Sequence, residues 1–228
     1  TDTTTMENNL RQTAEHFQSS NVFTSWTVIR TPGFASGVNY INQGLRNTFF
    51  KPNIVFLNML ESSTVQAEYA EVIKESIRLE LGVVLYARHE RAGLGQKKNI
   101  NIWISDRGPE WSISNGIGNL HLATLLSYKI HLNWNAEIRV ITVVKDETER
   151  GKAMKFMREL SELARMPQIQ ATVMTGSFTE ALDVAPYGDL NIFGLPPVLD
   201  FDALRSLQLK VDSSVLFVRD SGVENVMA

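Results

Sequence analysis

The run IVFLNM at residues 54–59 decides the fold class of this chain. Its apolar residues follow one another without polar alternation, which is typical of a strand covered on both faces of a parallel sheet. A helix capped by Ser63 with Gln66 comes next, and its apolar face is formed at helical spacing by Val65, Tyr69, Val72, Ile73 and Ile77. Gly82 ends this helix, and residues 83–87 form a second strand-like run. The segment therefore predicts a strand, a helix and a strand, the unit of a parallel α/β sheet.

The same alternation continues toward the C-terminus. We predict five further strands, at residues 100–105, 137–144, 169–174, 189–193 and 214–218. Between them we predict a helix at 115–128, a helix at 147–165 capped by Asp146 with Glu149, a short helix capped by Ser177 with Glu180, and one marked by Phe201, Leu204 and Leu207. Right-handed crossovers through such helices build a mainly parallel sheet.

The N-terminal region also begins with a helix. Apolar residues recur there at helical spacing, at Met6, Leu10, Ala14 and Phe17, and Thr4 with Glu7 forms a capping box. Residues 22–30 are rich in β-branched and aromatic side chains and predict a strand, and residues 35–46 predict another helix. The first helix has an apolar face that needs a sheet to cover it, yet no strand precedes it. We therefore expect the chain to be a fragment that lacks an upstream strand.

The predicted fold class is α/β, with mainly parallel sheets, helices on both faces and two related βα halves. We predict residues 1–87 as the first half and residues 100–228 as the second, joined by a basic connecting loop at 88–99. That loop carries four cations around Gly93 and Gly95, namely Arg88, Arg91, Lys97 and Lys98. An acidic lipid or a phosphate could bind them, but a flexible, solvated surface loop is the interpretation that such a composition favours.

Composition excludes several classes of function. The 228 residues include no cysteine, which rules out disulfides, thiolate metal sites and a cysteine nucleophile and fits a reducing compartment. The net charge is -3 and the pI about 5.8, so a nucleic acid is not an expected partner. No apolar run approaches the roughly 20 residues of a membrane-spanning helix. Residues 1–9 are polar and hold no signal-peptide core.

Ligands of open α/β sheets bind beyond the carboxyl ends of the strands. The loops to inspect therefore follow Arg30, Met59, Ser105, Val144, Met174 and Phe193. Gly116-Ile117-Gly118 leads into a helix, but His121 stands where a dinucleotide-binding motif has its third glycine, and ten residues separate Ser105 from Gly116. A Walker-type phosphate loop is absent. Neither a dinucleotide nor ATP is supported as a cofactor.

The sequence contains no recognisable motif for metal binding or catalysis either. The four histidines, His16, His89, His121 and His131, do not follow any ligand spacing. A G-x-S-x-G elbow is missing, and Ser105 beside Asp106 has no nearby histidine in sequence. Trp103 and Trp134 lie within apolar patterns and are interpreted as packing residues. We therefore predict no enzyme and assign no catalytic, cofactor-binding or metal-binding residue.

Several short motifs follow one another along the chain. They begin with Gly44-Leu45, Lys51-Pro52-Asn53 and the strand after them, and continue with Ile102-Trp103-Ile104 before Asp106 and Gly108. Then come Leu125-Leu126, Trp134, Ile138-Arg139-Val140, Leu190-Asn191-Ile192-Phe193-Gly194-Leu195-Pro196-Pro197 and Val215-Leu216-Phe217-Val218-Arg219. In this order the motifs resemble those of the cytosolic C-terminal domain of cation-chloride cotransporters. Eukaryotic members insert a long polar segment where this chain has only residues 175–188, so it resembles a prokaryotic-type member.

This resemblance implies a fold related to universal stress proteins. It also implies a homodimer and a regulatory role toward the transmembrane domain of the same polypeptide, on the cytoplasmic side of the cell membrane. The parent would be an electroneutral symporter whose ion selectivity resides in that other domain. Two alternatives stay open at this point: a stand-alone universal-stress-type sensor that binds a nucleotide, and a hydrolase or transferase whose catalytic residues converge only in space.

Overall fold

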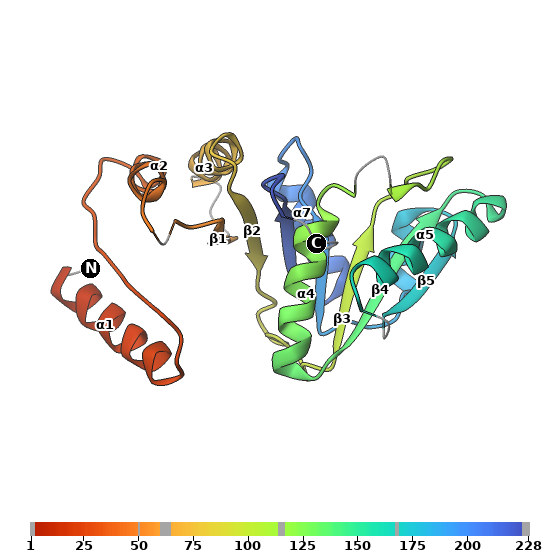
Figure 1. The fold of residues 1–228 in the computed structure, drawn as a ribbon, viewed down its shortest axis with the longest axis horizontal. Coiled ribbons are helices and arrows are strands. Elements are labelled where there is room, and N and C mark those ends of the chain that lie inside the picture. Colours follow the sequence, from red (N-terminus) through yellow and green to blue (C-terminus); the bar gives the residue numbers. More distant parts are fainter. Residues whose placement is uncertain (1–2, 50, 60–64, 114–116, 167–168, 225–228) are drawn as a thin grey trace.

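A computed structural model describes residues 3–49, 51–59, 65–113, 117–166 and 169–224 (Figure 1). The strands are β1 (Ile54–Asn58), β2 (Gly82–Ala87), β3 (Asn99–Ile104), β4 (Glu137–Val144), β5 (Gln170–Thr175), β6 (Leu190–Gly194) and β7 (Ser214–Arg219). The helices are α1 (Thr3–Ser19), α2 (Phe34–Leu45), α3 (Gln66–Arg78), α4 (Leu120–Trp134), the 3₁₀ turn η3 (Glu147–Glu149), α5 (Arg150–Leu163), α6 (Phe178–Val184) and α7 (Phe201–Val211).

The seven strands form one sheet in the order β1-β2-β7-β6-β3-β4-β5. Strands β3 to β7 all run in one direction, and β1 runs parallel to β2. The two groups meet where β2 pairs antiparallel with β7, with Leu85 opposite Phe217. The prediction of a mainly parallel sheet is thus confirmed. The last strand of the chain lies in the interior of the sheet and links its two groups.

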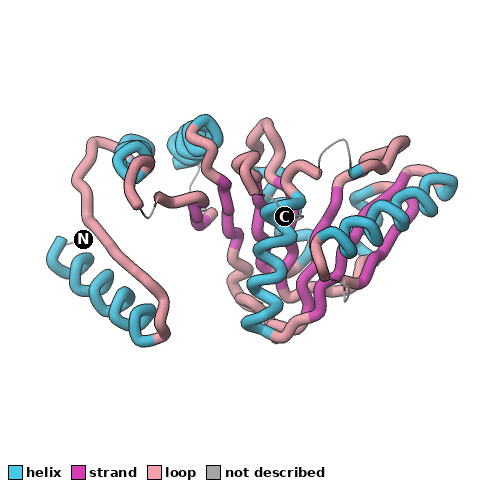
Figure 2. Tube along the Cα trace, in the orientation of Figure 1, coloured by secondary structure: helices cyan, strands magenta, loops and turns pink. Residues whose placement is uncertain are grey.

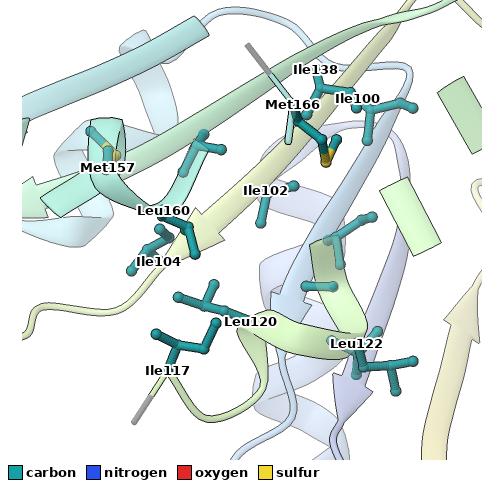
Figure 3. Close-up of a cluster of buried hydrophobic side chains, with 14 of the residues drawn as sticks. Ile100, Ile102, Ile104, Ile117, Leu120, Leu122, Ile138, Met157, Leu160 and Met166 are labelled. Carbon is teal, nitrogen blue, oxygen red and sulfur yellow. The ribbon is translucent and has the colours of Figure 1, made fainter. Parts of the chain in front are cut away.

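Helices cover both faces of this sheet (Figures 1 and 2). On one face, α4 and α5 bury a cluster that includes Leu122, Phe156 and Ile102, and Figure 3 shows part of it. On the other face, α3, α6 and α7 bury a second cluster around Phe193 and Phe217. Alternate residues of one strand contribute to opposite clusters because strand side chains alternate between the faces. The prediction of a sheet covered on both sides is confirmed for these strands.

Local signals predicted one helix cap in full, and the other predicted helix ends are displaced or made differently. Ser177 and Glu180 form the predicted capping box of α6. Asp146 does cap a helical turn, but its carboxylate accepts from the backbone N–H of Thr148 at 2.8 Å, and the predicted pairing with Glu149 is not made. The helix expected from residue 115 begins at Leu120, because the chain before it turns through Gly118 with φ +53°.

Other predicted boundaries moved by small amounts. Helix α1 begins at Thr3, one residue before the expected cap Thr4. Gly82 is the first residue of β2, and the left-handed Glu80 (φ +58°) ends the preceding helical segment in its place. The expected cap Ser63 lies outside the described residues.

The predicted strand at residues 22–30 is wrong. These residues form neither helix nor strand and run back beside α1, to which three hydrogen bonds connect them. The Val22 backbone N–H donates to the Phe17 carbonyl at 3.0 Å. Gln18 Nε2 donates to the Thr24 carbonyl at 3.1 Å, and the Arg30 guanidinium donates to the Thr3 hydroxyl at 3.3 Å. We call residues 3–30 the N-terminal arm. Helix α1 was expected to pack on a sheet, but it stands apart from the sheet in Figure 1.

The decisive run at residues 54–59 forms a strand, as predicted, but only one of its faces is covered. Strand β1 is the edge strand of the sheet. Val55 and Leu57 are buried beneath α3, while Phe56 points to the other face and is 58% exposed. The sequence pattern fails here because it records hydrophobicity and not the position of the strand in the sheet. An apolar surface at β1 results.

Candidate functional site

The directions of the strands determine which of the predicted site loops lie together at one end of the strands. Because β1 and β2 run opposite to the other strands, β1 finishes at the other end of the sheet. The predicted loop after Met59 falls on residues 60–64, outside the described residues. The loops after Ser105, Val144, Met174 and Phe193 lie together at the carboxyl ends of the parallel strands β3 to β6. Residue Arg30 follows no strand at all. The sheet thus brings four of the six predicted loops together.

The topological switch point of the parallel strands lies between β3 and β6, because the chain leaves β3 for β4 on one side and later enters β6 on the other. The side chain of Asn119 lies beside this point, where it links the ends of β6 and β7. Its Nδ2 donates to the Leu195 carbonyl at 3.3 Å, and its Oδ1 accepts from the Asp220 backbone N–H at 3.2 Å. A Cβ at Gly194 would lie 3.1 Å from Asn119 Nδ2, so the packing there is tight. The polar groups of Asn119 are therefore used within the chain itself.

A carboxylate of the chain also lies at the N-terminus of α4, where a phosphate-binding loop would hold its ligand. Asp220 Oδ1 accepts from the Leu122 backbone N–H at 3.0 Å. Burial raises the pKa of Asp220 to about 6, although this hydrogen bond opposes the shift. Helix N-termini attract anions, and here Asp220 already supplies one. The glycine pair before α4 therefore provides no free phosphate site, although Gly116 lies outside the described residues.

The loop after β3 uses its polar groups in its own structure. Asp106 accepts from the Gly108 backbone N–H at 2.8 Å and so closes a turn. The Arg107 guanidinium stacks over the Phe156 ring at 5.4 Å and donates to the Ile117 carbonyl at 3.3 Å. Burial lowers the pKa of Arg107. None of these contacts assembles a nucleophile with a base.

The four histidines are scattered over the fold. His89 Nε2 pairs with Asp212 at 3.0 Å while its Nδ1 accepts from a backbone N–H, and His131 Nδ1 contacts the Ala136 carbonyl at 2.5 Å. His121 lies at the start of α4, where burial lowers its pKa, and His16 lies in α1. Within the described ranges, no three potential ligands cluster in a way that could hold a metal ion.

The C-terminal end of the basic loop is bound by a buried carboxylate. Asp189 is 2% exposed, and its carboxylate accepts from the backbone N–H groups of Gln96, Lys98 and Asn99 at 2.7, 3.0 and 2.9 Å. Gly95 has φ +55° and packs directly on Asp189, which leaves no room for a Cβ. This anchor could not be predicted from local patterns, because about ninety residues separate Asp189 from the loop.

Two apolar surfaces remain exposed on the N-terminal side of the molecule. Along the arm and the following helix, Phe23 is 72% exposed and Tyr40 is 61% exposed. Phe56 on β1 forms the second surface together with Tyr86 of β2, whose ring centroid lies 6.1 Å away. Phe56 is exposed and Tyr86 is half-buried, so the two rings form a small apolar patch. No described helix is long and apolar enough to cross a bilayer.

The sheet and its helices define the class of protein as an α/β domain of the universal-stress type. A universal stress protein from Archaeoglobus fulgidus has a TM-score of 0.56 at 13% identity, and the match covers 94% of this chain and 76% of that one. A likeness at this identity concerns the fold alone. It confirms the predicted fold class.

Closer similarity identifies the family. Residues 1–94 match the first C-terminal domain of prokaryotic cation-chloride cotransporters, and residues 95–227 match the second. A crystal structure of the cytoplasmic domain of a prokaryotic cation-chloride cotransporter shares 34% identity and a TM-score of 0.90, over 100% of this chain and 84% of that one. No curated protein matches. The chain belongs to the prokaryotic cation-chloride cotransporters and is a cytoplasmic C-terminal domain, as the sequence motifs predicted.

Proposed function

We propose that this domain regulates an electroneutral cation-chloride cotransporter as a homodimer and catalyses no reaction. The observation that supports the proposal is the pair of exposed apolar surfaces, one on the N-terminal arm and one on β1. In the whole transporter, the N-terminal arm would lie next to the transmembrane domain of the same polypeptide, on the cytoplasmic side of the membrane. The division into halves at 1–87 and 100–228, joined by the loop 88–99, stays part of this proposal.

The apolar surfaces suit a second copy of the chain as their partner. Aromatic side chains such as Phe23 and Phe56 are enriched at the centres of protein interfaces because burial of each ring removes a large apolar area from water. An arm that packs on no sheet of its own chain can bind the uncovered face of β1 in a partner. Two such contacts, related by a twofold axis, would cover both surfaces in both copies.

Analytical ultracentrifugation of the 228-residue chain tests the dimer. We expect wild type to sediment as a dimer, and we expect Phe56→Asp to shift it to the monomer mass of 25.6 kDa. Val198→Asp is the matched control, because Val198 is 80% exposed in a different part of the surface. A wild-type monomer at high concentration, or equal dissociation of both variants, would refute the assignment of this interface.

Ion flux in proteoliposomes tests the regulatory role. In the whole transporter, Phe56→Asp should change the rate of chloride-coupled cation uptake while the amount of reconstituted protein stays equal. An electroneutral mechanism further predicts a rate that does not respond to a clamped membrane potential. Unchanged uptake in Phe56→Asp, alongside a proven loss of dimer, would separate dimerisation from regulation and contradict the proposed link.

The observations give no support to the two alternative functions. The nucleotide-sensor hypothesis requires free polar groups at the strand ends, and those of Asn119 and Asp220 are used within the chain. The hypothesis of a hydrolase or transferase requires a nucleophile next to a base. Asp106 does not act as such a base, because its carboxylate closes a turn. Calorimetric titration with ATP should therefore give no saturable heat.

A further inference from the structure

A small pocket lies at the end of the sheet where β1 and β2 begin. It is bounded by the C-terminal half of α2, the Lys51-Pro52-Asn53 turn and the junction of α3 with β2, and its volume is about 230 Å³. The Lys51-Pro52-Asn53 motif, which is part of the family resemblance, forms one wall of this pocket.

The pocket contains a buried amide that lacks a partner. Asn42 of α2 lines the pocket, is only 6% exposed, and its Nδ2 makes no hydrogen bond. The Oδ1 of Asn39, one helical turn earlier, is also buried and accepts no hydrogen bond. Buried side-chain polar atoms are nearly always satisfied, so each exception needs an explanation. A ligand that supplies an acceptor to Asn42 would provide one.

The charges in the pocket wall favour an anion. Arg46 and Lys51 both line it, and neither forms an ion pair with any side chain that the structure describes. Glu80 is the acidic side chain of the lining. Beyond Val223, the Glu224 carboxylate is held by the Ser221 hydroxyl and backbone N–H. Two cations therefore face one carboxylate in the wall.

The backbone acceptors nearby are already in use. Helix α3 ends in paired hydrogen bonds, from the Leu81 N–H to the Ser76 carbonyl at 2.9 Å and from the Glu80 N–H to the Ile77 carbonyl at 3.0 Å. At the end of α2, the Arg46 N–H donates to the Gln43 carbonyl. The anionic ligand is therefore inferred from the Asn42 amide and the two cations alone, because Asn39 Oδ1 and Glu224 Oε1 are buried acceptors without a partner.

We propose that this pocket binds a small metabolite with a carboxylate or phosphate group. Asn42 donates its amide N–H to the anionic group, and Arg46 and Lys51 supply the positive charge. The occupant is small because the pocket lies below the roughly 300–1,000 Å³ of sites for drug-sized ligands. This binding site is separate from the proposed dimer interface, and ligand binding in the pocket does not depend on dimerisation. Because the pocket joins α2 to the α3–β2 junction, an occupant would fix the helix that follows the arm.

Thermal unfolding and NMR of the 228-residue chain test the site, with sodium phosphate and sodium succinate as separate probes. We expect at least one probe to raise Tm saturably, with a dissociation constant of about 1 mM or tighter. The same probe should shift the NMR signals of the Asn42 side-chain amide. Sodium chloride at equal ionic strength should reproduce neither effect. The two probes distinguish a phosphate ligand from a carboxylate ligand.

Two variants make the test specific. Lys51→Gln should weaken binding about tenfold or more, whereas Lys74→Gln on the exposed face of α3 should leave it unchanged. Asn42→Leu should abolish binding and yet raise Tm in the absence of ligand, because it removes the unsatisfied amide. Failure of both probes, an equal effect of sodium chloride, or equal binding by wild type and Lys51→Gln would overturn the proposal. The oligomeric state is read out separately, so either proposal can fail without the other.

Discussion

Substitution of Asp189 offers the most stringent check on how this fold is held together. Its carboxylate accepts three backbone hydrogen bonds from the basic loop while itself 2% exposed. A hydrogen bond to a charged group contributes about 1.5–3 kcal/mol, so the sum could approach three times that figure. Water can reach part of the loop after the change, and we therefore expect Asp189→Ala to lower the free energy of unfolding by about 3 kcal/mol. In urea, the midpoint should fall by about 1–2 M.

Asp189→Asn separates the hydrogen bonds from the packing volume. It keeps the shape of the side chain, but one oxygen becomes an NH₂ group. Oδ2 of Asp189 accepts from both Lys98 and Asn99, and Oδ1 accepts from Gln96, so either orientation of the amide places donor against donor. Asp189→Asn should thus cost nearly as much as Asp189→Ala. Glu71→Ala, on the exposed face of α3, serves as the control and should change stability by less than about 0.5 kcal/mol. A loss below about 1 kcal/mol in both Asp189 variants would refute the anchoring argument.

Three further predictions concern single groups. Burial raises the pKa of Asp220 to about 6, above the ordinary value of 3.8 that it regains on unfolding, so its contribution to stability is full below pH 4 and lost as pH rises through 6. Urea titrations from pH 4 to pH 7 should show wild type losing stability relative to Asp220→Asn, by on the order of 1 kcal/mol because the group is partly solvated; a constant difference would contradict the shift. Ser177→Ala removes the capping box of α6 and should cost about 1 kcal/mol in the same assay, whereas Ser177→Asp should retain most of the stability. Trp103→Phe keeps the stacked ring but removes the 2.8 Å hydrogen bond from Nε1 to Asn191 Oδ1, and it should cost about 1–3 kcal/mol by leaving a buried acceptor unpaired; equal stability of this variant and wild type would mean that water or another donor replaces the indole.

The sequence predicted the elements whose signals are local. The strands from β2 to β7 combine β-branched residues with burial, and their positions were found to within one residue or so. The capping box at Ser177 needs only four residues and was predicted correctly. The fold class followed from the order of these elements, because parallel strands joined by helices admit few arrangements.

Features that depend on distant parts of the chain could not be predicted in this way. Residues 22–30 have the composition of a strand, but a strand also needs an edge to pair with, and the sequence does not say whether one is available. Phe56 lies in a wholly apolar run, yet its exposure follows from the place of β1 at the edge of the sheet. Asp189 and Asn119 are ordinary polar residues in sequence, and their roles appear only once residues 76 to 101 positions away pack against them.

The position of β7 determines when this sheet can be completed. Strands β1 and β2 are synthesised early and β6 late, but they cannot be joined until β7 has emerged from the ribosome and inserted between β2 and β6. Until then the first two strands have an open edge at β2 and must be kept from pairing elsewhere. A premature stop before residue 214 would consequently not shorten the domain at its margin but would split it into two separate sheets.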